Sequence, residues 1–358
     1  MYRGKTISVA IASYNGDKYI REQLESILNQ TVLPDEIVIS DDGSTDKTLC
    51  ILREFSSSAS SFCITTTVLT DNPRHGFAFN FGYAVGHCSG DIVFICDQDD
   101  VWLPDKIEHI ANVYLNKKDA LCVFHNAASV DYQGKPINIV FNKYIEAISQ
   151  NISQGESIIR LSGEKYCEMA ASVPFVNGMV MSVSKELLET AYPFPPISSQ
   201  HDGWLLFCAL TQDKCYYLDE VLTLRRLHNQ NTSGAGKQGL GINRIRKIVR
   251  NIEQHNNYSK NRILYAKFMK DYLLKYCGED SPIAKRAFPT ISRIQEIGTY
   301  EIEAAESGRV LGTIRLSRLF IRDKRYRRSG VKLFLYELAD IILFSKHERT
   351  RRMQLDDS

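Results

Sequence analysis

In the first hundred residues, short β-type runs alternate with amphipathic helix-type runs, and this alternation constrains the fold more than any other feature of the chain. The pattern is typical of a parallel sheet whose faces are covered by helices. It predicts strands at 7–12, 36–40, 64–69 and 91–96, helices at 19–30, 44–55 and 77–87, and a polar loop at 56–61. We therefore expect chemistry at the edge of the sheet where the parallel strands end.

The rest of the chain has a mixed and then a helical pattern. Strand-like pieces occur at 121–124 and 175–183, a helix is predicted at 203–210, and a Ser-Gly-Ala-Gly break at 233–236 precedes a basic segment. We expect residues 1–234 to form one α/β domain with halves at 1–105 and 106–234. Residues 235–358 are expected to form a helical, basic C-terminal region.

Charge is divided unevenly along the chain. Of 358 residues, 44% are hydrophobic and 24% charged, an ordinary globular composition that suggests neither a disordered nor a fibrous protein. Up to Gly234 the chain has 18 Lys and Arg against 28 Asp and Glu, whereas the remainder has 26 against 14. Because the N-terminal part is acidic and no nucleic-acid-binding motif occurs, we expect no nucleic-acid partner.

Nine cysteines are spread along the chain without a Cys-x-x-Cys pair, and several lie inside apolar runs. This usage is typical of free thiols in a reducing compartment. The first residues lack the apolar stretch of a secretory signal, and the longest apolar region, 331–344, is interrupted by three charged residues. We therefore expect a cytoplasmic protein that does not span a membrane.

The first candidate site is the run Asp97-Gln98-Asp99-Asp100, which directly follows the apolar strand predicted at 91–96. Three carboxylates this close together repel one another, and a divalent cation is the simplest partner to offset the repulsion. Oxygen ligands favour Mg²⁺ or Mn²⁺, which typically bind one or two carboxylates and the phosphates of a substrate. An acidic loop that caps the next helix is the alternative interpretation.

The second candidate site is Asp41-Asp42-Gly43-Ser44-x-Asp46, which follows the strand at 36–40 and should reach the same edge of the sheet. A carboxylate here can accept a hydrogen bond from N3 of uracil or thymine. Tyr14, at the end of the first strand, offers a face on which the base can stack. A turn with a helix N-cap is the alternative for this motif.

Four motifs in this order resemble glycosyltransferase family 2: Ser13-Tyr14-Asn15, Ser26-Ile27-Leu28-x-Gln30-Thr31, Asp41 to Asp46, and Asp97-Gln98-Asp99-Asp100-x-Trp102-x-Pro104. The resemblance covers about residues 7–234. It implies a GT-A fold, an inverting mechanism and a nucleotide-diphosphate-sugar donor, with residues 1–105 as the nucleotide-binding half and 106–234 as the acceptor half. By position, Asp42 resembles the residue that pairs with the pyrimidine, Asp97 the one near the ribose, and Asp99 the metal ligand.

Two later motifs extend the resemblance. In Gln200-His201-Asp202-Gly203-Trp204, Asp202 matches the family's catalytic base, with His201 as the next candidate, and Trp204 could pack against the sugar or the acceptor. A helix N-cap is the alternative function of the His-Asp pair.

The closing motif runs from Arg225 to Gly234. The resemblance implies that His228 completes the metal site and that Arg225 or Arg226 neutralises the diphosphate. A surface histidine and a solvated basic pair are the alternatives.

The residues of the Asp97–Pro104 motif and of the His201–Trp204 motif are most similar to those of bacterial rhamnosyltransferases of polysaccharide assembly. This resemblance implies dTDP-L-rhamnose as the first candidate donor. UDP-hexoses and UDP-N-acetylhexosamines are the alternative donors. Self-association into a homo-oligomer is a further open alternative. A sugar-nucleotidyltransferase is less favoured because Ser13-Tyr14-Asn15-Gly16 is not a Gly-rich phosphate loop. A non-catalytic scaffold is less favoured because neither the metal motif nor the base motif lacks its aspartate.

The basic tail carries eight basic residues against one acid between Arg309 and Arg328, interleaved with apolar side chains. This composition suits an anionic membrane surface, where each Lys or Arg contributes on the order of 1 kcal/mol. We therefore expect a peripheral protein on the inner face of the cell membrane, with a lipid-linked glycan acceptor. A helical lid or a dimer interface is the alternative.

Overall fold

The computed structural model describes residues 1–72, 76–152, 155–172, 175–192, 194–195, 201–229, 231 and 252–306. The chain divides into two compact units. The first contains Met1–Lys237 and Met269–Thr290, and the second contains Gln238–Phe268 and Ile291–Ser358. The expectations for the tail at 309–328 and 331–344 lie outside the described residues.

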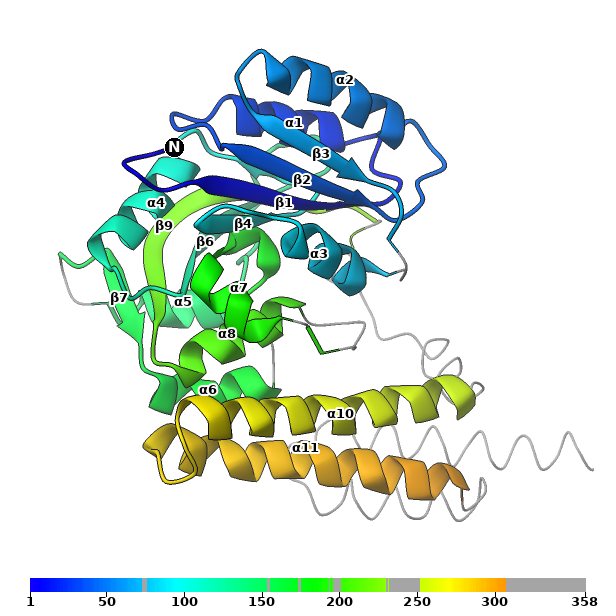
Figure 1. Ribbon diagram of the computed structural model, residues 1–358, viewed down its shortest axis with the longest axis vertical. Coiled ribbons are helices and arrows are strands. Elements are labelled where there is room, and N and C mark those ends of the chain that lie inside the picture. Colours follow the sequence, from blue (N-terminus) through cyan, green and yellow to red (C-terminus); the bar gives the residue numbers. More distant parts are fainter. Residues whose placement is uncertain are drawn as a thin grey trace, which may run out of the picture. The chain divides into compact units, whose positions relative to one another are not determined.

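A mixed, mostly parallel sheet forms the centre of the first unit (Figure 1). Within the described residues its strand order is β3-β2-β1-β4-β8-β6-β9-β5, with β7 paired to β9. The strands are β1 Ile7–Ser13, β2 Glu36–Asp41, β3 Thr65–Leu69, β4 Ile92–Cys96, β5 Val101–Trp102, β6 Cys122–Val130, β7 Ile158–Leu161, β8 Met181–Ser184 and β9 Cys215–Arg226. Strands β1 to β4 pair in parallel, whereas β8 is antiparallel to both β4 and β6.

Helices cover both faces of this sheet. Alternate residues of β1, Ile7, Val9 and Ile11, pack in one core with the apolar sides of helices α1, α2 and α4, while α3 contacts β1 and β2. The helices are α1 Ile20–Leu28, α2 Thr48–Ser60, α3 Phe77–Gly86, α4 Lys106–Asn116, α5 Lys143–Ser149, α6 Gly163–Ser172, α7 Lys185–Ala191, α8 His201–Thr211, α10 Ile252–Tyr276 and α11 Pro282–Glu306. The expected helix-covered α/β sheet is confirmed.

Two local predictions were wrong. The serines expected as a loop at 56–61 belong to the end of α2, because their hydroxyls donate to the helix's own carbonyls; Ser56 Oγ, for example, donates to the Leu52 oxygen at 2.9 Å. That helix begins at Thr48, whose backbone N–H donates to Asp46 Oδ1, rather than at Ser44 or Thr45.

The strand expected at 175–183 is shorter than predicted, since Gly178–Val180 form a 3₁₀ turn (η1) and only Met181–Ser184 form β8. A Cβ atom at Gly178 would lie 2.9 Å from His201 Nε2, so this turn depends on a residue without a side chain.

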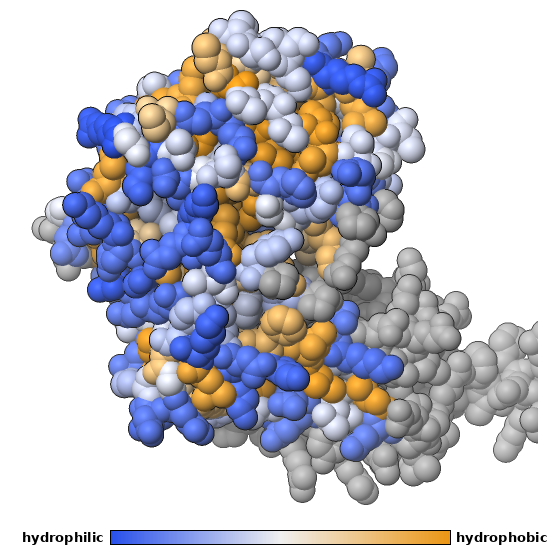
Figure 2. Space-filling model, in the orientation of Figure 1, coloured by the Kyte–Doolittle hydropathy of each residue, from blue (hydrophilic) through white to orange (hydrophobic). Residues whose placement is uncertain are grey.

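The helices α10 and α11 each contribute residues to both units. In the first unit, the Tyr272 hydroxyl contacts Thr190 Oγ1 at 3.0 Å and accepts from Gln212 Nε2 at 2.9 Å. In the second unit, Gly298 lies against the Ser259 carbonyl and the Ile263 side chain. Figure 2 shows hydrophobic side chains among the charged ones along both helices. Within the described part of the chain, no helix is both long and apolar enough to cross a membrane.

Candidate functional site

The carboxyl ends of β1, β2 and β4 meet at one edge of the sheet. Their parallel register pairs Ser13 with Asp41 and Ile11 with Cys96, so the loops that follow these strands start side by side. These loops carry Tyr14, Asp42 and the Asp97–Asp100 run. The structure therefore brings the two acidic motifs to the same edge.

Gln98 joins the first of these loops to the third through two hydrogen bonds with the Tyr14 backbone. Its Oε1 accepts from the Tyr14 backbone N–H at 2.9 Å, and its Nε2 donates to the Tyr14 carbonyl at 3.0 Å. The Tyr14 ring remains 55% exposed, so one of its faces is available for stacking. A Cβ atom on Gly16 would collide with the Gln98 amide, which explains the glycine at this position.

The two aspartates at the carboxyl end of β2 make different contacts. Asp41 is buried, and its carboxylate accepts from the Ser44 N–H, the Ser44 hydroxyl and the Ser13 hydroxyl at 2.6 to 2.8 Å. It therefore builds the loop. Asp42 is only partly buried, and its Oδ2 accepts from the Gly76 N–H at 2.8 Å, at the start of α3. That bond orients the carboxylate predicted to meet a pyrimidine.

Three carboxylates converge after β4. One oxygen atom from each of Asp97, Asp99 and Asp100 lies within 4.8 Å of the others. Burial, and then the charges of Asp99 and Asp202, raise the pKa of Asp97 to about 7. Burial and the Asp99 charge raise the pKa of Asp100 well above its ordinary value, and Asp100 Oδ2 has no hydrogen-bond partner among the described residues. This set of oxygen ligands fits a divalent cation, whose positive charge would relieve the repulsion.

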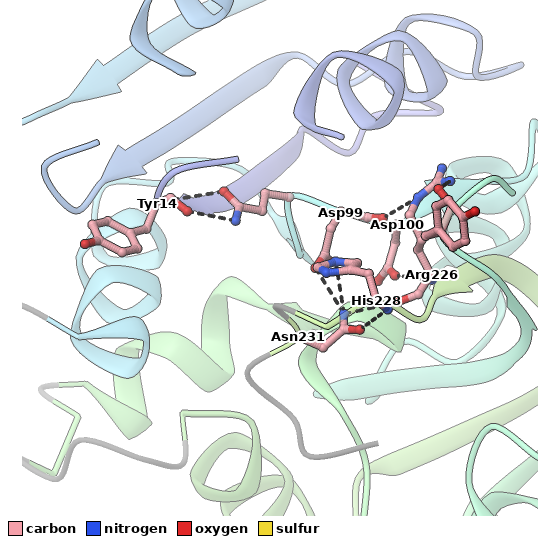
Figure 3. Close-up of polar contacts among 8 residues, drawn as sticks. Tyr14, Asp99, Asp100, Arg226, His228 and Asn231 are labelled. Carbon is pink, nitrogen blue, oxygen red and sulfur yellow. Dashed lines mark hydrogen bonds and ion pairs between the residues drawn. The ribbon is translucent and has the colours of Figure 1, made fainter. Parts of the chain in front are cut away.

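His228 lies directly beside this cluster (Figure 3). Its Nε2 is 2.8 Å from Asp99 Oδ2, and the two side chains are only 8% and 17% exposed. The imidazole also stacks on the Tyr19 ring, with the ring centroids 4.6 Å apart. The alternative of a solvent-exposed loop histidine was therefore wrong, and both predicted metal ligands meet.

The neighbouring arginines differ in their contacts. Arg226 is nearly fully buried; its backbone N–H donates to Asp100 Oδ1 at 3.0 Å, and its Nε donates to the Asp99 carbonyl at 3.1 Å. Its Nη2 also donates to Glu22 on α1. Arg225 lies over the Phe141 ring, 5.5 Å from its centroid, and its positive charge counteracts the rise in the pKa of Asp97. Neither arginine is a solvated surface cation.

Helix α8 supplies the predicted base. Asp202 lies in its first turn, accepts from the Gly203 N–H at 2.7 Å, and is close enough to Asp97 for its charge to raise the pKa of that residue. His201 is buried and stacks on Phe81, with a centroid distance of 4.3 Å. Burial lowers the pKa of His201, and within the described part of the chain neither of its ring nitrogens has a hydrogen-bond partner.

The expectation that Trp204 packs against the sugar or the acceptor was wrong. Its indole is 3% exposed, donates to the Ala191 carbonyl at 2.9 Å and packs edge-on against Tyr272. The ring is a core residue because α8 is buried along almost its whole length.

Sequence reasoning missed Lys106. Its ammonium donates to the Met179 carbonyl at 2.8 Å and to Thr223 Oγ1 at 3.0 Å, and lies 3.9 Å from the centroid of the Trp102 ring. Burial lowers its pKa to about 7, although the nearby charge of Asp100 opposes the shift. Helical spacing could have found it, since Lys106 is four residues before Ile110 on the buried face of α4.

Comparisons with known proteins find similarity to glycosyltransferases. Residues 8–163 match the model of the family described as Glycosyl transferase family 2. An uncharacterized glycosyltransferase of Nostoc sp. is 30% identical over 230 residues, which cover 63% of this chain and 66% of that protein. The dTDP-rhamnosyl transferase RfbG of Shigella flexneri is 28% identical over 229 residues, which cover 63% of this chain and 74% of that protein.

The fold has a solved counterpart in TarS 1–349 of S. aureus, crystallised with UDP-GlcNAc. The two chains share 14% identity with a TM-score of 0.51, over 94% of this chain and 92% of that one. The expected GT-A fold is thereby confirmed. The matches span less than two thirds of the length of several curated relatives, among them 19% of a chondroitin synthase of Escherichia coli. Residues 8–163 therefore form a domain of glycosyl transferase family 2.

Proposed function

We propose that the protein is a metal-dependent, inverting glycosyltransferase that moves a sugar from a nucleotide-diphosphate donor to a hydroxyl group of a growing glycan. The observation that carries the proposal is the meeting of Asp99 and His228, with 2.8 Å between Oδ2 and Nε2, at the strand edge that also carries Asp42 and Tyr14. Adjacent ligands of an octahedral ion with bonds of about 2.1 Å lie roughly 3 Å apart, so this pair suits Mn²⁺ or Mg²⁺.

The donor would lie along the edge formed by these loops. Tyr14 stacks on the base, Asp42 accepts from the N3 proton of uracil or thymine, and Asp97 binds near the ribose. A bound Mn²⁺ or Mg²⁺ would stabilise the charge that develops on the leaving diphosphate. Arg225 adds a positive charge close enough to Asp97 to counteract the rise in the pKa of that residue.

Asp202 is the proposed base. An inverting transfer needs a group that takes the proton of the incoming hydroxyl on the face opposite the departing diphosphate. Asp202 comes from α8, later in the chain than the loops proposed to hold the nucleotide, and it is close enough to Asp97 for its charge to raise the pKa of that residue. This position supports residues 106–234 as the acceptor half of the domain.

The donor sugar that we propose first is L-rhamnose from dTDP-L-rhamnose. The similarity to a dTDP-rhamnosyl transferase of Shigella flexneri supports this choice. A UDP-hexose or a UDP-N-acetylhexosamine is the second candidate, because the side chains at the strand edge are proposed to contact the pyrimidine and the diphosphate, and these contacts do not distinguish one hexose from another. A lipid-linked acceptor at the inner face of the cell membrane is proposed from the charge of residues 235–358.

A donor panel tests the proposal. The full chain is incubated with dTDP-L-rhamnose, UDP-glucose, UDP-galactose and UDP-N-acetylglucosamine, and release of the nucleotide diphosphate is measured with Mn²⁺, with Mg²⁺ and with EDTA. We expect release from at least one donor and its loss in EDTA. Formation of a nucleotide sugar from a sugar phosphate and a nucleoside triphosphate would instead favour a sugar-nucleotidyltransferase, and no turnover of any donor would favour a scaffold.

A further inference from the structure

The amide of Asn231 makes hydrogen bonds with three parts of the candidate metal site (Figure 3). Its Nδ2 donates to Asp99 Oδ2 at 3.2 Å and to the Arg226 carbonyl at 3.1 Å. Its Oδ1 accepts from the His228 backbone N–H at 2.6 Å, and its own backbone N–H donates to the His228 carbonyl at 3.3 Å. One side chain therefore contacts both proposed metal ligands.

These contacts fix different degrees of freedom. The two bonds to the His228 backbone hold that backbone against Asn231, which fixes the point from which the imidazole extends. The bond to Asp99 fixes the same carboxylate oxygen that faces His228 Nε2, and Asn231 Nδ2 itself lies 3.3 Å from that nitrogen. Because Asn231 is 9% exposed, water competes little for these bonds.

We infer that Asn231 is a positioning residue that holds Asp99 and His228 in the arrangement needed to bind the cation. The inference rests on the proposed function, since that function makes Asp99 and His228 the ligands. Asn231 carries no charge and is not itself a ligand in this role. Partners of metal ligands act through orientation, and their loss commonly costs about 10- to 100-fold in metal affinity or activity.

Asn142 offers a matched control. It is a partly buried asparagine that caps the N-terminus of α5, because its Oδ1 accepts from the Tyr144 and Ile145 N–H groups, and its Nδ2 donates to the Phe175 carbonyl at 2.8 Å. It contacts neither of the proposed metal ligands. Asn142→Ala therefore removes a similar number of structural hydrogen bonds without affecting their orientation.

The experiment compares full-length wild type, Asn231→Ala, Asn231→Leu and Asn142→Ala. Asn231→Leu keeps the side-chain volume and removes the hydrogen bonds, which separates packing from orientation. For each protein, the Mn²⁺ concentration that gives half-maximal release of nucleotide diphosphate is measured with the donor found in the panel. The affinity for UDP and dTDP in EDTA and the thermal unfolding midpoint are measured in parallel.

We expect both Asn231 variants to need about 10- to 100-fold more Mn²⁺, with turnover recovering at high Mn²⁺ and the affinity in EDTA unchanged. Asn142→Ala should lower the unfolding midpoint and leave the Mn²⁺ requirement as in wild type. An unchanged Mn²⁺ requirement in the Asn231 variants, an equal change in Asn142→Ala, or failure of both Asn231 variants to fold overturns the inference. Wild-type activity that is insensitive to EDTA overturns the metal site itself, and so is a different result.

Discussion

The side-chain amide of Gln98 and the backbone of Tyr14 form two reciprocal hydrogen bonds, of 2.9 and 3.0 Å, that tie the loop after β4 to the loop after β1. One loop carries the proposed metal ligand Asp99, and the other carries the aromatic ring proposed to bind the base. The positions proposed for the metal and the nucleotide are therefore linked through Gln98, which lies between Asp97 and Asp99 in the sequence. The two hydrogen bonds require a glycine at position 16, because a Cβ atom on Gly16 would displace the Gln98 amide.

The first prediction concerns this link. Gly16→Ala and Gln98→Ala should each lower the free energy of unfolding by roughly 1 kcal/mol, the usual scale for a net loss of such hydrogen bonds. Each should also weaken binding of UDP or dTDP. Because both changes remove the same two bonds, the double variant should be little worse than either single one. Urea unfolding and calorimetry measure the effects, and fully additive losses would contradict the coupling.

The sequence predicts the sheet and its edge well, for a physical reason. Buried parallel strands require short apolar runs, and the order of the first strands along the chain places their ends together, so Asp42 and Asp97 could be assigned to one edge. The prediction failed for residues 56–61, since serine composition indicates a loop but the hydroxyls are satisfied within α2. Trp204 failed for a similar reason, because aromatic composition does not distinguish core from binding surface.

The contacts of the closing motif could not be predicted from local pattern. His228 reaches Asp99 because β9 pairs with β5 and β6, strands far away in sequence, and no periodicity encodes that pairing. The family resemblance alone suggested His228. The different contacts of Arg225 and Arg226 also could not be predicted from the sequence. They arise because adjacent residues of one strand point to opposite faces of the sheet.

The second prediction is that Asp99→Ala removes the metal-dependent part of nucleotide affinity without unfolding the protein. The Asp99 side chain is one proposed ligand and keeps 17% of its surface exposed, so its loss should affect the cation more than the fold. Calorimetry with UDP and dTDP, with and without Mn²⁺, measures it. Asp91→Ala is the control, because Asp91 precedes the same strand at the opposite edge and accepts from Thr6. If the Asp99 variant still bound UDP or dTDP more tightly with Mn²⁺ than without it, Asp99 would be excluded as a metal ligand.

The third prediction is that Asp202→Asn leaves donor affinity near normal and lowers turnover by about 10²-fold or more, the range expected for loss of a general base. Steady-state rates and donor calorimetry separate the two effects. Asp213→Asn, just beyond the other end of α8, serves as the control, since the new amide oxygen can still accept from Gly163. Full activity of the Asp202 variant would place the base elsewhere, and His201→Phe would then be the next variant.

The fourth prediction uses the pKa of Lys106, which burial lowers from 10.5 to about 7. Between pH 7 and 10.5 the folded protein holds this lysine neutral while the unfolded chain keeps it protonated, so the unfolded state binds more protons. The free energy of unfolding therefore rises with pH across this window. Below about pH 7 the lysine is charged in both states, and the folded protein bears the full cost of burying that charge.

Lys106→Met should remove that contribution, so the stability difference between variant and wild type should shift in favour of wild type as the pH rises from 7 to 9.5. Urea unfolding at several pH values measures this difference. Lys117→Met is the control, because Lys117 is exposed at the end of the same helix. A stability difference that does not change with pH would show that Lys106 stays charged in the folded protein.

The fifth prediction is that residues 235–358 bind the enzyme to anionic membrane. The segment has 26 Lys and Arg against 14 Asp and Glu, and its basic residues alternate with apolar ones between Arg309 and Arg328. Binding would combine electrostatic attraction with apolar insertion, so added salt should weaken it without abolishing it. Flotation of the full chain with phosphatidylglycerol vesicles measures binding, with phosphatidylcholine vesicles as the control. If the protein ignores phosphatidylglycerol vesicles at low salt, the segment is better explained as a lid or a dimer interface, whose contacts do not depend on lipid charge.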